Sequence, residues 1–472
     1  MSEAARPPSW RSRIAAREAA GRQVLGGLAA AIVASQWVRV IQRPHGDFAL
    51  HWRFGARFLA REFLYAGNLH VPYPPFWGLA SAPLTLLPMP WMRTLLYPLG
   101  LVPLAALLGI LHGLTRSHLR LAPTPRFWAT ALALGLSSRF LIRELPDNGV
   151  NLMMVALAWG AVGLWVRGRD RLGGACLGLA IALKCTPALF LVYFAWKRQW
   201  RLVTTAVTAA AAFTLAPALW QGPGDYERHM RCWLARCARG VAEPHPLRGV
   251  LGDEEVKNLA LRPGLARFLI HLPPGHKGHC PHPWHVDFLD LPPAVAGVAV
   301  KVVMVALLAA VAWAFRRPVA RRDGLTPLWE CAAVSVLMLL YSPITWRQHC
   351  VGVLPAFYLI AHMAVARGGL PRWMTRTLGV YALLVLVLDR GVVGRDLTLL
   401  LDSYSVTTWS LLALLAVTLG CRALAPCAEG DRAGHESASP TVLGRVNGPG
   451  AVVRGPIPGH RHAPEPTRVD AS

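Results

Sequence analysis

The chain has 472 residues, of which 54% are hydrophobic and 16% are charged, and its mean hydropathy is +0.37. A soluble domain seldom has this composition, so we expect an integral membrane protein. The formal net charge of +24 at pH 7 would suggest a nucleic-acid partner on a soluble chain. Here the basic residues mostly flank apolar blocks and indicate membrane topology, so we expect membrane lipids and no nucleic acid as partners.

Apolar blocks of roughly 17 to 22 residues recur along the chain, each long enough to cross a bilayer as a helix. About ten spans are expected, near residues 23–40, 92–114, 127–143, 149–166, 201–220, 294–315, 327–343, 349–366, 373–389 and 398–421. Two further apolar pieces, 75–90 and 172–196, contain prolines or paired glycines and are expected to be re-entrant or kinked. The sequence therefore predicts an all-α, polytopic membrane protein.

Arginine clusters set the expected orientation of these spans. No small-residue cleavage site follows the first block, so residues 1–22 are expected to be a cytoplasmic segment before a retained span. The membrane domain then covers 23–421, with external loops at about 41–74 and 221–293. Residues 422–472 are rich in Gly, Pro, Ser, Arg and His and are expected to form a disordered cytoplasmic tail.

This orientation places four polar segments on the outer face of the membrane. They are the segment around Asp47, the Pro146–Asn151 segment, the 221–293 loop and the Ser342–His349 segment. Polar groups that converge from distant spans are typical of an active site at a membrane surface. Four arginines also fall on the outer face, against the rule that basic residues stay in the cytoplasm; they are Arg43, Arg53, Arg57 and Arg61. Either residues 75–114 do not make a single net crossing, or these arginines bind an anionic ligand such as a phospholipid.

Several short motifs follow one another along the chain. Asp47 follows the first span, Tyr65 and Tyr73-Pro74-Pro75 close the first loop, and Lys184-Cys185-Thr186-Pro187 and S-P-I-T-W-R-Q-H come later. Over roughly residues 23–420 the chain resembles the polyprenyl-phosphate-mannose-dependent mannosyltransferases, a branch of the C-type (GT-C) membrane glycosyltransferase superfamily. Two motif elements depart from that family's pattern, at 148–151 and 258–261, and leave subgroup and substrate open.

The resemblance implies a GT-C-like bundle of roughly 10–12 transmembrane helices in the cell membrane, with the active site on the external, periplasmic side. It implies transfer of a hexose, mannose in this family, from a polyprenyl-phosphate donor to a lipid or glycan acceptor. We expect an inverting hexosyltransferase that needs no metal and no cofactor, because no Asp-x-Asp pair occurs in a candidate outer loop. A transporter or flippase of lipid-linked sugars is the alternative, although such proteins usually have related halves.

The expected chemistry assigns roles to individual residues. A sugar hydroxyl is a poor nucleophile, so a base must accept its proton, and Asp47 is the candidate. The departing lipid phosphate gains negative charge, and His349, Arg347 and Lys184 are the candidates to meet it. Structural alternatives are that Asp47 only ends a helix, Arg347 anchors at headgroups and Lys184 snorkels to the interface.

Four further residues are candidates for substrate binding. Tyr65 and Tyr73 could shape an isoprenoid groove, or belong to an interfacial aromatic belt. Asn148 and Asn151 could bind sugar hydroxyls, or cap two closely spaced helices. Glu62 is expected to be solvated or ion-paired.

A histidine-rich stretch between His276 and His285 contains ligand types that suit zinc or copper. Its spacing matches no zinc template, so no metal site is assigned. Three cysteines fall in the external loop, Cys232, Cys237 and Cys280, and only these could form a disulfide in an oxidising compartment.

The topology can be tested with reporter fusions. Fusions after residue 45, within 230–285 and after residue 345 should report an outside location, and fusions near 168, 320 and 370 an inside location, because the basic clusters stay in the cytoplasm. If the fusion after residue 345 reports inside, His349 and Asp47 lie on opposite faces and cannot share a site.

Overall fold

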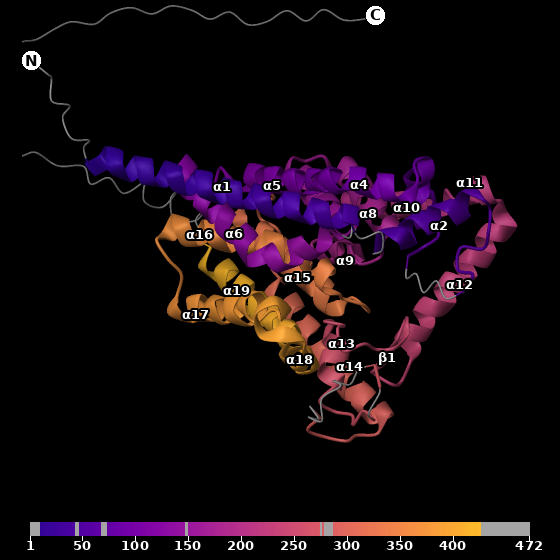
Figure 1. Cartoon of the computed structure of the whole chain (residues 1–472). Coiled ribbons are helices and arrows are strands. Elements are labelled where there is room, and N and C mark those ends of the chain that lie inside the picture. Colours follow the sequence, from indigo (N-terminus) through magenta and orange to yellow (C-terminus); the bar gives the residue numbers. More distant parts are fainter. Residues whose placement is uncertain are drawn as a thin grey trace, which may run out of the picture. The chain divides into compact units, whose positions relative to one another are not determined.

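The computed structural model describes residues 10–42, 47–67, 73–146, 150–273, 276–277 and 287–425. In these ranges nearly every regular element is a helix, which confirms the all-α prediction (Figure 1). The first half contains α1 (Trp10–Gln42), α2 (Asp47–Leu59), α3 (Phe76–Ser81), η1 (Ala82–Leu86), α4 (Met89–Leu99), α5 (Leu101–Thr115), α6 (Pro123–Glu144), α7 (Asn151–Val166), α8 (Asp170–Leu183), α9 (Ala188–Trp196), α10 (Trp200–Leu215) and α11 (Ala218–Gln221).

The second half begins with the long polar helix α12 (Pro223–Ala242). A short antiparallel pair follows, in which β1 (Arg248–Gly249) hydrogen-bonds to β2 (Gly252–Asp253). The remaining helices are α13 (Leu261–Ala266), α14 (Pro293–Ala314), α15 (Leu325–Tyr341), η2 (Arg347–Val353), α16 (Leu354–Arg367), α17 (Arg372–Tyr381), η3 (Ala382–Val387), α18 (Arg390–Ser403) and α19 (Val406–Leu424). The predicted tail lies outside the described residues from 426 onward.

Six described helical segments are long and apolar enough to cross a membrane, so the chain is a multi-pass membrane protein. They are Ala16–Gln42, Met89–Thr115, Trp200–Gln221, Pro293–Ala314, Arg347–Arg367 and Val406–Leu424. A seventh is added if the segments Arg372–Val387 and Arg390–Ser403, bent by 99°, form one broken span. The predicted spans 149–166 and 327–343 coincide with the shorter apolar helices α7 and α15, many of whose side chains pack inside the bundle. The predicted span 127–143 lies within α6, which is not among the candidate membrane spans.

One predicted span begins too early. The block 398–421 is divided in the structure, because α18 ends at Ser403 and α19 begins at Val406. Ser405 between them has a φ of 53°, a left-handed conformation that interrupts the helix. The sequence of α18 suits such a break, because its Asp402 carboxylate pairs with Arg347 of η2 instead of facing lipid.

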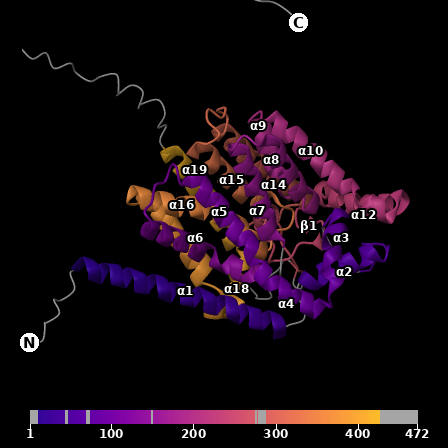
Figure 2. The ribbon, with the colours of Figure 1, turned by 90° about the horizontal axis from the view of Figure 1, so that it is seen from above.

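Helix α1 runs along one edge of the bundle (Figures 1 and 2). It packs mainly against α4, where the Tyr97 hydroxyl donates to the Val33 carbonyl oxygen over 2.9 Å and Trp37 Nε1 donates to the Thr94 carbonyl oxygen over 3.0 Å. Apolar side chains of α1 are otherwise largely exposed, among them Val24 and Leu28. A helix with this exposure suits a position against lipid.

Glycines allow α8 to lie unusually close to α10. A Cβ at Gly174 would come within 2.6 Å of the Leu202 carbonyl oxygen, and one at Gly178 within 2.6 Å of the Ala206 carbonyl oxygen. This Gly-x-x-x-Gly spacing is a common way for membrane helices to pack without a hydrophobic driving force. At its far end α8 stops at Lys184, whose backbone is extended, and α9 turns back, as expected for a re-entrant 172–196 piece.

A buried carboxylate ties three helices together at the end of the bundle where α15 begins. Glu330 of α15 is 1% exposed and contacts Lys197 Nζ at 2.8 Å and Arg422 at 2.7 Å. The Tyr193 hydroxyl of α9 donates to the same carboxylate over 3.0 Å. Removing one partner of such a buried pair leaves an uncompensated charge, so the cluster fixes how α9, α15 and α19 pack.

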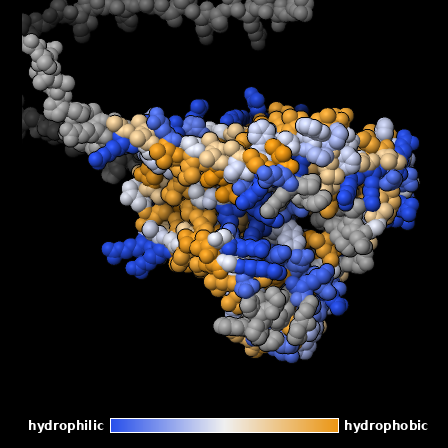
Figure 3. Space-filling model, in the orientation of Figure 1, coloured by the Kyte–Doolittle hydropathy of each residue, from blue (hydrophilic) through white to orange (hydrophobic). Residues whose placement is uncertain are grey.

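The surface in the view of Figure 3 is divided by polarity. Apolar side chains gather over α17 and α19, and polar side chains gather around α13 and α18. Ion pairs hold both ends of α18, because Arg139 of α6 contacts Asp389 at 2.6 Å and Arg347 of η2 contacts Asp402 at 2.8 Å. The segments around α13 and α18 are therefore expected to lie outside the hydrocarbon layer.

The first loop folds into a compact unit in which α2 packs against α3 and η1. A Cβ at Gly55 would lie 2.3 Å from the Ser81 carbonyl oxygen, so only glycine permits this approach. Trp77 Nε1 donates to His51 Nδ1 over 3.0 Å, which places the proton of a neutral His51 on Nε2. Burial lowers the pKa of His51 from 6.5 to about 4, with Asp47 opposing and Lys184 reinforcing the shift.

This pKa makes the fold sensitive to acid. Above pH 6.5 His51 is neutral in both folded and unfolded chains, and between pH 6.5 and 4 only the unfolded chain gains the proton, so stability falls as the pH falls. The whole shift corresponds to about 3 kcal/mol. We expect thermal unfolding in detergent to occur at lower temperature at pH 5 than at pH 7.5.

His51→Asn is the matched control, because its amide oxygen can replace Nδ1 as the acceptor for Trp77 and does not titrate. The difference between the two pH values should be smaller in this variant. An equal difference in both proteins would show that other groups cause the acid sensitivity.

Candidate active site

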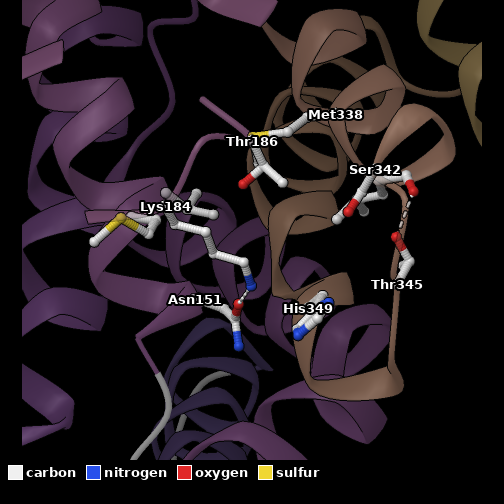
Figure 4. Close-up of a pocket in the computed structure, with 10 residues that line it drawn as sticks. Asn151, Lys184, Thr186, Met338, Ser342, Thr345 and His349 are labelled. Atoms are coloured by element: carbon white, nitrogen blue, oxygen red, sulfur yellow. Dashed lines mark hydrogen bonds between the residues drawn. The ribbon is translucent and has the colours of Figure 1, made fainter. Parts of the chain in front are cut away.

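Four segments that are distant in the sequence line one cleft. They are the start of α7, the break between α8 and α9, the end of α15 and η2 (Figure 4). Its polar lining residues are Asn151, Lys184, Thr186, Ser342, Thr345 and His349. The structure thus brings together three of the predicted site residues, namely Asn151, Lys184 and His349.

Lys184 faces this cleft from the tip of the α8–α9 hairpin. Its Nζ donates to Asn151 Oδ1 over 2.7 Å, as the dashed line in Figure 4 marks, and lies 5.7 Å from the centre of the Tyr73 ring. The snorkelling alternative is therefore wrong in this structure, because the ammonium is held within the protein. An ammonium at this point of the cleft can pair with an anion.

Asn151 is held on both sides by charged groups. Its Nδ2 donates to Glu144 Oε2 over 2.9 Å, and its backbone N–H donates to Glu144 Oε1 over 2.7 Å. The amide is thus engaged with Glu144 and Lys184, in keeping with the capping alternative, and its contact with a sugar stays a prediction. The sequence reasoning missed Glu144, although an acid at the end of a predicted span was a signal.

His349 lies in η2 with its ring at the cleft. Its Nδ1 lies 3.1 Å from the Ile344 carbonyl oxygen and 3.2 Å from the Trp346 backbone nitrogen. These contacts within its own motif fix the ring relative to Ser342 and Thr345. Donors and cations grouped in this way can stabilise a developing oxyanion.

Asp47 begins α2 and is linked to the same motif. Gln348 Nε2 donates to Asp47 Oδ2 over 2.9 Å, across 301 positions of sequence. Asp47 itself is exposed and does not line the cleft. Its carboxylate therefore lies beside the residue that precedes His349, and Gln348 was not among the predicted site residues.

Asn258 attaches the long loop to the Ser342–His349 motif. Its Nδ2 donates to Glu254 Oε2 over 2.6 Å and to the Pro343 carbonyl oxygen over 3.1 Å, and its Oδ1 accepts from the Thr345 backbone N–H over 2.9 Å. Burial raises the pKa of the Glu254 carboxyl. Two motif elements that are far apart in the sequence are thus one structural unit.

Arg347 points to a different partner. Its guanidinium donates to both carboxylate oxygens of Asp402 over 2.8 Å, and it is not among the cleft-lining residues. The neighbouring Arg267, 1% exposed, donates to the Asp402 carbonyl oxygen over 3.1 Å. In this structure Arg347 anchors α18 to the motif, and its contact with a donor phosphate stays a prediction.

The two tyrosines of the first loop support its shape. Tyr65 is 2% exposed, and its hydroxyl donates to the Tyr73 carbonyl oxygen over 2.8 Å. The Tyr73 ring stacks on Trp77 with centroids 5.2 Å apart. Burial raises the pKa of both tyrosines above the usual value. The Tyr73 ring thus lies beside the Lys184 ammonium, and the Tyr65 hydroxyl supports the Tyr73 backbone.

Some predicted features lie outside the described residues. These are Asn148, most of the histidine-rich stretch and Cys280. Cys232 and Cys237 are free thiols, and Glu62 lies 4.0 Å from Arg57, as expected for an ion-paired side chain. Within the described ranges no group of three or more His, Cys, Asp or Glu side chains could hold a metal ion.

Comparison with known proteins places the chain among glycosyltransferases. The profile of glycosyltransferase family 87 matches residues 71–343, which include Asn151 and Lys184 but neither Asp47 nor His349. No solved structure matches.

Two curated relatives are each 27% identical to the chain. One is a polyprenol-phosphate-mannose-dependent alpha-(1-2)-phosphatidylinositol mannoside mannosyltransferase of Mycobacterium tuberculosis, matched over 75% of this chain and 77% of the relative. The other acts on phosphatidylinositol pentamannoside in Mycolicibacterium smegmatis and is matched over 64% of each chain. Because the family profile covers more than half of the sequence, this chain is a member of glycosyltransferase family 87.

Proposed function

We propose that this glycosyltransferase moves mannose from a polyprenyl-phosphate donor to a lipid-borne glycan at the outer face of the membrane, with Asp47 as general base. The relatives' donor and their phosphatidylinositol mannoside acceptors support the substrate classes. The observation that carries the proposal is the Gln348 to Asp47 hydrogen bond, because it brings a carboxylate beside the cationic cleft. Membership in an enzyme family favours transfer over the transporter alternative.

The proposed reaction is a single displacement. The acceptor hydroxyl attacks the anomeric carbon of the donor while its proton passes to the Asp47 carboxylate. The bond from the anomeric carbon to the phosphate oxygen breaks, and its electron pair remains on the phosphate. Lys184 and His349 line the cleft where the added negative charge would be stabilised.

Asp47→Asn tests the base. The substitution preserves size and an acceptor for Gln348 but removes the basic carboxylate, so transfer should fall by roughly 10²- to 10⁴-fold. Radiolabelled mannose transfer from polyprenyl-phosphate-mannose is measured in membranes with equal protein levels. Glu62→Gln, in the same loop and paired with Arg57, is the control and should change little. A turnover above about a tenth of wild type in Asp47→Asn would refute the assignment.

His349→Asn tests the leaving-group side of the cleft. Asparagine retains an acceptor near the Nδ1 position but removes the rest of the ring, so donor turnover should fall by roughly 10- to 100-fold. His271→Ala, a partly exposed histidine paired with Asp287, is the control. Transfer should also persist in EDTA. Complete loss on chelation, restored by zinc, would instead support a metal-dependent mechanism.

A further inference from the structure

Glu144 is a buried carboxylate that the proposed reaction does not use. It is the last residue of α6, it is 1% exposed, and it accepts hydrogen bonds from the backbone N–H groups of Asn151 and Leu152 over 2.7 and 3.1 Å. N–H groups in the first turn of a helix have no acceptor within the helix, and the N-cap residue of α7, Val150, makes no side-chain cap. Glu144 therefore caps α7 from a neighbouring helix.

The third hydrogen bond to Glu144 fixes the orientation of a side-chain amide. Asn151 Nδ2 donates to Glu144 Oε2 over 2.9 Å, and Asn151 Oδ1 accepts from Lys184 Nζ over 2.7 Å. An ionised carboxylate can only accept and an ammonium can only donate, so the amide has one orientation that satisfies both. The three side chains form a directional chain from a buried anion to a cation at the cleft.

We propose that Glu144 is a positioning residue that sets the location of the Lys184 ammonium through Asn151. The role of Lys184 toward the donor phosphate rests on the proposed function, whereas the positioning itself does not. Because Glu144 already occupies the N-terminus of α7, that helix end is closed to an anionic ligand. The anion is then directed to Lys184 and His349, the cationic and polar side of the cleft.

Glu144→Gln reverses the polarity of this chain. Its new NH₂ group faces the NH₂ group of Asn151, and if the amide turns to relieve this conflict, Nδ2 meets the Lys184 ammonium. The exchange variant Glu144→Gln with Asn151→Asp restores the pattern. The glutamine NH₂ then donates to one aspartate oxygen, and the other oxygen accepts from Lys184. The total charge of the three side chains is also restored.

The first readout does not depend on transfer. Purified protein in detergent is treated with acetic anhydride, and acetylation of Lys184 is followed by mass spectrometry, with buried Lys197 as the internal reference. Because only a neutral, accessible amine reacts, Glu144→Gln should increase Lys184 labelling by roughly tenfold, as expected for loss of a charge-assisted hydrogen bond. The exchange variant should return to within about twofold of wild type.

Asn151→Ala keeps the helix cap, because Glu144 retains both backbone donors, but it removes the connection to Lys184. It should increase Lys184 labelling as much as Glu144→Gln does, while thermal stability changes less. This variant keeps the test valid if Glu144→Gln fails to fold. Unchanged Lys184 labelling in either variant, or an exchange variant no better than Glu144→Gln, would overturn the proposal.

The second readout is transfer by the same proteins. The ratio kcat/KM for the donor should fall roughly 10- to 100-fold in Glu144→Gln and recover in the exchange variant, with the KM for the acceptor unchanged. A general loss of structure would lower kcat/KM for the donor and for the acceptor alike. The exchange variant would not restore either ratio. If labelling follows the expected pattern but wild type transfers no mannose, the positioning role stands and the proposed function fails.

Discussion

Charged and polar groups inside this apolar bundle must find partners within the chain, since lipid offers none. Two carboxylates meet this constraint in different parts of the bundle. Glu330 receives Lys197, Arg422 and the Tyr193 hydroxyl, and so fixes three helices at one end of α15. The other end of α15 lines the cleft, and there Glu144 accepts hydrogen bonds from backbone N–H groups in the first turn of α7. Of the two, Glu144 is the one linked to cleft-lining side chains, through Asn151 and Lys184.

Close helix packing then determines which groups reach the cleft. Gly174 and Gly178 let α8 lie against α10, and the extended backbone at Lys184 ends α8 beside the start of α7. A lysine in an apolar hairpin would be costly in lipid, but here its ammonium has an amide partner. The hairpin therefore delivers a cation to the site without exposing it to hydrocarbon.

The sequence predicted what depends on apolar blocks and charge clusters. The helices and the broken 75–90 and 172–196 pieces follow from that pattern. Lys184 and His349 were instead named together because of the motif resemblance, and both line the cleft. The side-chain partner of each charged residue was not predictable in the same way. The ion pair of Arg347 with Asp402, for example, joins residues 55 positions apart and depends on the bend before α18. Glu144 follows the predicted span 127–143 directly, but its partners could not be predicted, because two of its three donors are backbone N–H groups.

The two sides of the proposed reaction centre differ in how firmly they are held. Lys184 is held through a buried chain of three side chains, and the His349 ring is fixed by contacts within its own motif. Asp47 is exposed, and its side-chain contact is with Gln348. An oxyanion site gains from preorganisation, because fixed dipoles need not reorient as charge develops. A base that must admit a bulky glycan acceptor gains from an open approach, and the position of Asp47 at the start of α2 provides it.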